Sequence, residues 1–169
     1  MPRVATYNAG MANPPDICIR GAGIVGRTLA LLLAREQLNV ALVEAPTPET
    51  TADVRAYSLN GAAMALLQDL RCWPESPAVT PVHQMQVWGD HGGQLNFGAN
   101  ALGVGELNWM VDVPVLQDRL AQAVQFQPHI QLVNAPVAAP LTVVCEGRAS
   151  QTRAELGVGF DITRYEQHA

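Results

Sequence analysis

The segment from Asp16 to Glu44 constrains the fold of this 169-residue chain more than any other part. Residues 16–20 are suited to a buried strand, and a G-x-G-x-x-G pattern formed by Gly21, Gly23 and Gly26 follows directly. Apolar periodicity predicts a helix over 24–38 and a second strand over 39–43, which ends at Glu44. This order of strand, glycine turn, helix and strand is the context in which the pattern binds a dinucleotide.

Each glycine has a distinct expected role in such a unit. Gly21 permits the tight turn out of the strand, Gly23 lets a diphosphate approach the backbone, and Gly26 allows the helix to pack closely on the sheet. The amide groups at the start of the helix, around Ile24 and Val25, then hold the diphosphate together with the helix dipole. The alternative is a glycine-rich turn that binds nothing.

Glu44 is the expected ribose contact. It lies eighteen positions after Gly26, at the tip of the second strand, where a carboxylate can accept hydrogen bonds from both ribose hydroxyls. An acid at this position would repel a 2′-phosphate, so we expect FAD or NAD rather than NADP. The alternative is an ordinary solvated carboxylate at a strand end.

Composition excludes several classes of protein. The chain is 49% hydrophobic and 15% charged, as expected for one globular domain with a real core. A net charge of −5 argues against nucleic-acid binding. No apolar run reaches the length of a membrane span, and the four histidines have no metal-ligand spacing. Three separated cysteines indicate a reduced, cytoplasmic compartment, and residues 1–15 are expected to form a flexible tail.

The rest of the chain alternates between helix and strand signals. A helix is predicted over 59–70, capped by Ser58 or Asn60, and another begins near Pro114. Strands are predicted over 83–88 and 95–97, as a hairpin, and over 107–111, 130–133 and 141–145, followed by a helical piece over 149–156. The fold class is therefore α/β, with a mostly parallel sheet in three layers and part of a second β-rich region.

Two further side chains are candidate ligands of a nucleotide. Arg55 precedes a helix and could pair with a diphosphate or ribose, although a surface ion pair with Asp53 is equally expected. Gln117 lies one turn into the helix that begins near Pro114 and could donate to a cofactor, or it could be an exposed helix residue. No general acid, general base or nucleophile stands out, which suits a protein whose chemistry belongs to its cofactor.

The order of these motifs resembles the FAD-dependent aromatic hydroxylases, specifically the ubiquinone-biosynthesis branch of the p-hydroxybenzoate-hydroxylase-like flavoproteins. GAGIVG with Glu44 is similar to the family's dinucleotide motif, and Asp53-Val54-Arg55 to its D-x-R segment. Gln117 matches the position of a flavin-contacting Arg or Gln. Residues 145–153 resemble a second motif, normally Asp-Gly followed by Ser and Arg, so Glu146 and Gly147 are implied FAD contacts, with Glu in the usual Asp position.

The resemblance implies a Rossmann-like FAD-binding domain over 16–160, with an inserted β-hairpin region at about 80–112. Residues 161–169 would begin a substrate domain that is missing, so the chain looks like the N-terminal part of a longer enzyme. Such an enzyme hydroxylates an aromatic ring with FAD, O₂ and NAD(P)H as transient reductant. In ubiquinone synthesis the substrate carries a prenyl tail, which implies peripheral membrane contact. The alternatives are a non-catalytic dinucleotide-binding module and an NAD-dependent dehydrogenase.

Overall fold

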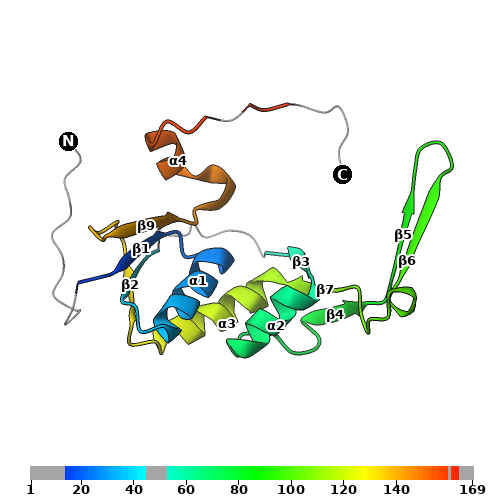
Figure 1. The fold of residues 1–169 in the computed structure, drawn as a ribbon, viewed down its shortest axis with the longest axis horizontal. Helices are drawn as coiled ribbons and strands as arrows, with labels where there is room; N and C mark the ends of the chain where they lie inside the picture. The colour runs from blue at the N-terminus through cyan, green and yellow to red at the C-terminus, as the bar shows by residue number, and fades with distance from the viewer. Residues whose placement is uncertain (1–13, 45–52, 160, 164–169) are drawn as a thin grey trace.

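A computed structural model describes residues 14–44, 53–159 and 161–163. Most of the predicted tail (1–15), the loop after Glu44 and most of the predicted start of a second domain (161–169) lie outside the described residues. Within them, the chain forms one parallel sheet, one antiparallel sheet and one separate hairpin (Figure 1). None of the described helices is long and apolar enough to cross a lipid bilayer.

The parallel sheet has four strands in the order β8-β2-β1-β9, where β1 is Ile17–Arg20, β2 Val40–Val43, β8 Ile130–Val133 and β9 Leu141–Val144. β1 lies between β2 and β9, with Ile17 opposite both Val40 and Leu141. β1 and β2 read as near-continuous apolar runs, as expected of parallel strands buried on both faces. The prediction of an α/β fold with a parallel sheet is confirmed.

Helix α1 (Ile24–Arg35) connects β1 to β2 and lies beside α3 (Val113–Gln125) (Figure 1). The buried residues of α3 are Val113, Leu116, Leu120 and Val124, spaced so that they share one helix face. Of these, Leu116, Leu120 and Val124 join alternate residues of the strands in one hydrophobic core, namely Ile17, Ile19, Val40 and Leu42. Because burial of each such side chain contributes about 1.5–3 kcal/mol, this core fixes the position of α1 and its N-terminus.

The end of α1 corrects the predicted boundary at residue 38. The helix ends at Arg35, because Gln37 has a positive φ of 65° that is incompatible with a continuing helix. The amide of Leu38 then bonds back to the carbonyl oxygen of Leu33 at 3.2 Å, which closes the helix end. The apolar periodicity continues past the helix because Leu38 still packs on the core.

The second sheet is antiparallel, in the order β3-β7-β4, with β3 Ala56–Leu59, β4 Val79–Val82 and β7 Asn108–Asp112. Only β7 was predicted as a strand. Helix α2 (Gly61–Asp69) starts two residues later than predicted, since Leu59 pairs with Trp109 in the sheet. Of the two proposed caps, Asn60 is the one observed, because its Oδ1 accepts from the amide of Ala63 at 2.9 Å.

The predicted hairpin is observed as β5 (Gln84–Trp88) and β6 (Gln94–Gly98), and it projects from the rest of the molecule (Figure 1). A short helical turn η1 (Asn100–Leu102) follows it. After β9, η2 (Gly147–Ala149) and α4 (Gln151–Glu155) complete the described elements. The predicted helix over 149–156 is therefore shorter than expected, because Ser150 caps α4 by accepting from the amide of Arg153.

Candidate functional site

The carboxyl ends of the parallel strands carry the predicted site residues. Gly21 follows β1, Glu44 follows β2, and Glu146 lies two residues after the end of β9. β2 and β8 follow β1 on one side, whereas β9 returns to pair on its other side, so the strand order reverses beside β1. In open parallel sheets, ligands bind at such a switch point, beyond the carboxyl ends of the strands.

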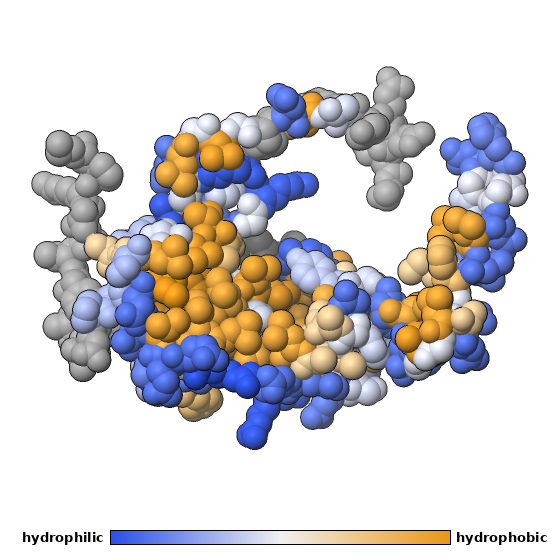
Figure 2. Space-filling view, viewed as in Figure 1, coloured by the Kyte–Doolittle hydropathy of each residue, from blue (hydrophilic) through white to orange (hydrophobic). Residues whose placement is uncertain are grey.

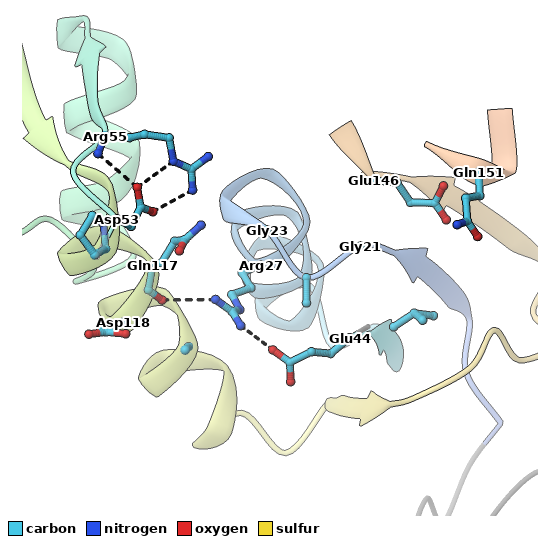
Figure 3. A pocket seen from close by; sticks show the side chains of 14 residues that line it. Gly21, Gly23, Arg27, Glu44, Asp53, Arg55, Gln117, Asp118, Glu146 and Gln151 are labelled. Atoms are coloured by element: carbon cyan, nitrogen blue, oxygen red, sulfur yellow. Dashed lines mark hydrogen bonds and ion pairs between the residues drawn. The ribbon is translucent and has the colours of Figure 1, made fainter. Parts of the chain in front are cut away.

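A cavity of about 730 Å³ opens at this edge (Figure 3). The sheet edge, the start of α1, the segment before β3 and the first turns of α3 all contribute to it. Its lining residues are Gly21, Ala22, Gly23, Arg27, Val43, Glu44, Asp53, Arg55, Pro114, Gln117, Asp118, Ala121, Glu146 and Gln151. The volume falls within the range of small-molecule sites.

The three glycines differ in what a side chain would meet. A Cβ on Gly26 would lie 1.8 Å from the carbonyl oxygen of Gly21. A Cβ on Gly21 would lie 2.5 Å from the carbonyl oxygen of Cys145. These two glycines are therefore required by the packing of the protein on itself. Among the described residues, apart from its chain neighbours, a Cβ on Gly23 would meet no atom within 4 Å, although Gly23 lines the cavity. The open space above Gly23 leaves its backbone accessible to a ligand.

The start of α1 lies beside this space. Gly23 is the N-cap residue, no side chain caps the helix, and its first turn contains no acidic residue. The first amide groups of a helix lack partners within the helix, and the helix dipole makes this end attractive to anions. Together with the accessible backbone of Gly23, this arrangement suits a diphosphate.

Arg27 joins Glu44 to α3 across the cavity wall. Its Nη2 lies 2.6 Å from Oε1 of Glu44, and its Nη1 donates to the backbone carbonyl oxygen of Gln117 at 3.4 Å (Figure 3). The Arg27 side chain is 15% exposed and that of Glu44 is 42% exposed. Sequence reasoning missed Arg27, although its position four residues after Gly23 places both on one face of the helix.

Arg55 is held by Asp53. Its Nε and Nη2 each donate to Asp53 at 2.8 Å, and the Asp53 carboxylate also accepts from the Arg55 amide at 3.1 Å (Figure 3). The side-chain hydrogen bond from Arg55, and then the backbone one, lower the pKa of Asp53 to about 2. The expected surface ion pair with Asp53 is confirmed. Arg55 also lines the cavity, so its pairing with a nucleotide stays a prediction.

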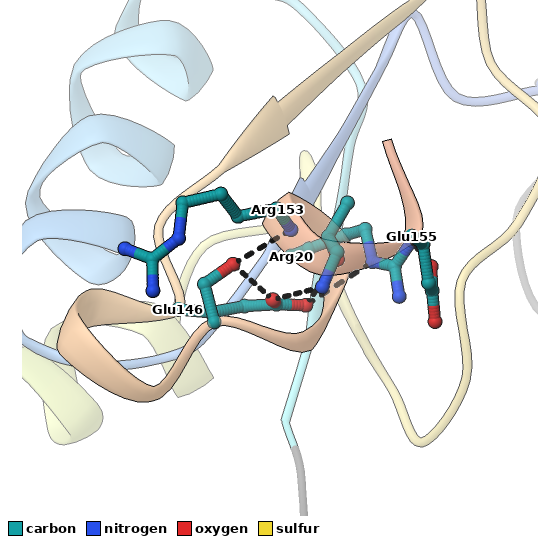
Figure 4. A network of polar contacts seen from close by, with 6 residues as sticks. Arg20, Glu146, Arg153 and Glu155 are labelled. Carbon is teal, nitrogen blue, oxygen red and sulfur yellow. Dashed lines mark hydrogen bonds and ion pairs between the residues drawn. The ribbon is translucent and has the colours of Figure 1, made fainter. Parts of the chain in front are cut away.

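Glu146 is bound by the loop that follows it (Figure 4). Its oxygens accept from Ser150 Oγ at 2.7 Å, from Thr152 Oγ1 at 2.6 Å and from the Thr152 amide at 3.0 Å. Nε of Arg20 lies 3.3 Å from Oε1, and Arg20 also pairs with Glu155. Desolvation alone would raise the pKa of Glu146, but the hydrogen bonds from Thr152 and Ser150, with the charge of Arg20, lower it to about 2. The carboxylate therefore fixes the start of α4 beside β1.

The structure brings together six of the ten predicted site residues in one cavity lining: Gly21, Gly23, Glu44, Arg55, Gln117 and Glu146. Ile24 packs against the core, Val25 is exposed and Gly26 is buried, so these three could reach a ligand only through their amide groups. Gly147 lines a neighbouring cavity of about 320 Å³ that also borders Glu146. Besides Arg27, sequence reasoning missed Asp118 and Gln151, whose exposed helix positions carried no signal.

Sequence comparison finds two curated relatives that are named as hydroxylases of ubiquinol or ubiquinone. The chain is 28% identical over 183 residues to the 3-demethoxyubiquinol 3-hydroxylase of Escherichia coli (strain K12), an alignment covering 91% of this chain and 46% of the relative. It is also 28% identical over 184 residues to the ubiquinone hydroxylase UbiL of Rhodospirillum rubrum, an alignment covering 91% of this chain and 42% of the relative. No protein-family profile matches the chain. The chain spans about half the length of the curated relatives it matches.

Two solved structures of monooxygenases have a fold similar to that of this chain. PqsL of Pseudomonas aeruginosa, a probable FAD-dependent monooxygenase, matches with a TM-score of 0.69 at 18% identity, over 90% of this chain and 48% of its own. The p-nitrophenol 4-monooxygenase PnpA of Pseudomonas putida matches with a TM-score of 0.66 at 14% identity, over 87% of this chain and 44% of PnpA. The fold matches that of about half of each of these monooxygenases, and the resemblance seen in the sequence is confirmed.

Proposed function

We propose that this relative of the ubiquinone hydroxylases binds the ADP part of FAD in the cavity at the carboxyl edge of its parallel sheet. We further propose that it serves a flavin-dependent monooxygenase that hydroxylates an aromatic ring of the ubiquinone-precursor type. Since the chain spans about half the length of its curated relatives, the activity of the whole enzyme remains part of this proposal.

The observation that carries the proposal is the open space above Gly23. Packing explains Gly21 and Gly26, but within the described part of the chain only the neighbours of Gly23 lie within 4 Å of the place where its Cβ would point. The uncapped start of α1 adjoins this space, and Glu44 lies at the tip of the neighbouring strand. An anion at the helix start and a ribose at the carboxylate are the two groups that an adenine dinucleotide would place there.

Each lining residue then has a defined task. Glu44 accepts from the ribose hydroxyls, and the amide groups of Ile24, Val25 and Gly26 donate to the diphosphate. Arg55 approaches the cofactor from the segment before β3, and Gln117 donates from α3 on the other side. Glu146 and Gly147 shape the end of β9, where the cofactor would continue towards its ring.

FAD, when bound, supplies the redox chemistry, with NAD(P)H as reductant and O₂ as the source of the oxygen atom. The part of the chain described here binds and orients the cofactor. The names of the relatives favour an aromatic substrate of the ubiquinol type. Because such a substrate is prenylated in ubiquinone synthesis, we propose peripheral contact with the membrane. The three separated cysteines favour a cytoplasmic compartment. A domain over 16–160, followed by a substrate domain from 161, remains the proposed organisation.

Separate titrations of the purified protein with FAD and with NADH test the proposal. Quenching of flavin fluorescence should show saturable FAD binding, and ADP should compete with it. Tight binding of NADH without binding of FAD would instead support the NAD-dependent dehydrogenase. A folded protein that binds neither would overturn the proposal.

A further inference from the structure

The ion pair between Arg27 and Glu44 lines the cavity that the proposed function assigns to the nucleotide. The guanidinium is mostly buried, and its Nη2 lies 2.6 Å from one of the two carboxylate oxygens of Glu44. A charge-assisted hydrogen bond of this length fixes both the orientation of the carboxylate and the position of the cation. Oε1 is thereby engaged by the protein, which leaves Oε2 to meet a ribose hydroxyl.

Neither partner depends on the other for its backbone position. The amide of Arg27 donates to the carbonyl oxygen of Gly23 at 2.9 Å, at the start of α1. The amide of Glu44 donates to the carbonyl oxygen of Val133, also at 2.9 Å. The Gln117 carbonyl oxygen, 3.4 Å from Nη1, gives the guanidinium a second contact on α3. Loss of the Glu44 charge should therefore leave a cation at the cavity wall.

We propose that Arg27 and Glu44 act as one specificity unit for the 2′ position of a bound adenine nucleotide; this inference rests on the proposed function. With the pair intact, the carboxylate selects a free 2′-hydroxyl and also holds Arg27 away from anions. Without the carboxylate, Arg27 binds a 2′-phosphate, because a guanidinium matches the geometry of phosphate oxygens. The segment thus contains a latent 2′-phosphate site that Glu44 suppresses.

Two ligands that differ only at the 2′ position test this inference: ADP and its 2′-phosphorylated form. Their dissociation constants are measured by isothermal titration calorimetry on the full chain, with circular dichroism confirming that each variant is folded. The variants are Glu44→Gln, the double variant Glu44→Gln/Arg27→Met, and Glu44→Gln/Arg27→Lys, which keeps a cation. Glutamine preserves the shape of Glu44, so the comparison isolates its charge.

Wild-type protein should prefer ADP. Glu44→Gln should move the affinity ratio towards the 2′-phosphorylated ligand by at least about tenfold, the range of one hydrogen bond to a charged group. Arg27→Met in that background should remove most of the shift and leave only the relief of repulsion by Glu44, and Arg27→Lys should retain more of it. Equal ratios in Glu44→Gln and Glu44→Gln/Arg27→Met would overturn this inference alone. Wild-type protein that is folded but binds neither ligand would overturn the proposed function and this inference together.

Discussion

Gly23 and Gly26 lie three positions apart in the chain, but substitution should affect them in opposite ways. Gly26→Ala should destabilise the fold by at least about 1–3 kcal/mol, since its Cβ would lie 1.8 Å from the carbonyl oxygen of Gly21. Gly23→Ala should cost less than about 1 kcal/mol, because its Cβ meets open space and its φ of −75° suits alanine. Urea unfolding of both variants measures the difference.

Gly23→Ala should change nucleotide binding rather than stability. Gly23→Ala should remain folded and bind ADP more weakly than wild type, because its methyl group would occupy the space expected for the diphosphate. If Gly23→Ala bound ADP as well as wild type does, the space above Gly23 would not be the nucleotide site.

The ionised Glu146 should make the stability of the fold sensitive to acid. Its pKa is lowered from 4.5 to about 2, so its stabilising contribution is fully present above pH 4.5. That contribution is lost as the pH falls from about 4.5 towards 2, because protonation removes the acceptors of Ser150 and Thr152. Glu146→Gln should lower stability at pH 7 by roughly 1 kcal/mol and flatten this part of the profile.

Melting temperatures of wild type and Glu146→Gln from pH 2 to pH 7 measure this effect. Asp53→Asn is a useful control, because Asp53 also has a pKa of about 2 but contacts Arg55 at the surface, away from α4. Parallel profiles for wild type and Glu146→Gln would contradict the structural role given to Glu146.

At the scale of elements, the cap of α2 offers the simplest test of the antiparallel region. Asn60 accepts from the amide of Ala63, so Asn60→Ala should cost about 1 kcal/mol of stability, whereas Asn60→Asp should restore most of it. Chemical denaturation of the three proteins measures the cost. An equal loss in Asn60→Asp would mean that the side-chain oxygen of Asn60 does not cap the helix.

Most elements could be predicted from their local sequence, whereas β3 and β4 could not. Strand β1, helix α1 and the hairpin carry their own periodicity and turn residues. β3 and β4 were missed because their residues gain strand structure by pairing with β7, and β4 contains Pro81, which argues against a strand. Helix α1 was predicted too long because Leu38 continues the apolar pattern beyond the helix.

In the candidate site, residues recognised by local spacing were found, whereas residues that act through distant contacts were missed. Gly21, Gly23 and Glu44 were found because their spacing alone places them at one edge of a parallel sheet. Arg27 was missed because its importance arises from a contact with Glu44, seventeen positions away, and from a second contact with α3. The hydrogen bonds that fix Glu146 likewise depend on the turn that brings Thr152 back to it.

At the scale of the whole molecule, the projecting hairpin has one apolar face. Met85, Val87, Leu95 and Phe97 lie on it as two cross-strand pairs, and each is at least 40% exposed (Figure 2). One-sided alternation of this kind is typical of an antiparallel sheet that packs on one face. The cavity that we propose for the nucleotide lies instead at the carboxyl ends of β1, β2 and β9, beside α1 and α3. Cofactor binding can therefore be tested on this chain directly.

A crystal structure of the chain soaked with ADP tests the central claim most directly. The account predicts the diphosphate at the start of α1, above Gly23, and a ribose hydroxyl within hydrogen-bond distance of Glu44. ADP bound elsewhere on the protein, or a cavity that stays free of ADP at saturating concentration, would contradict it.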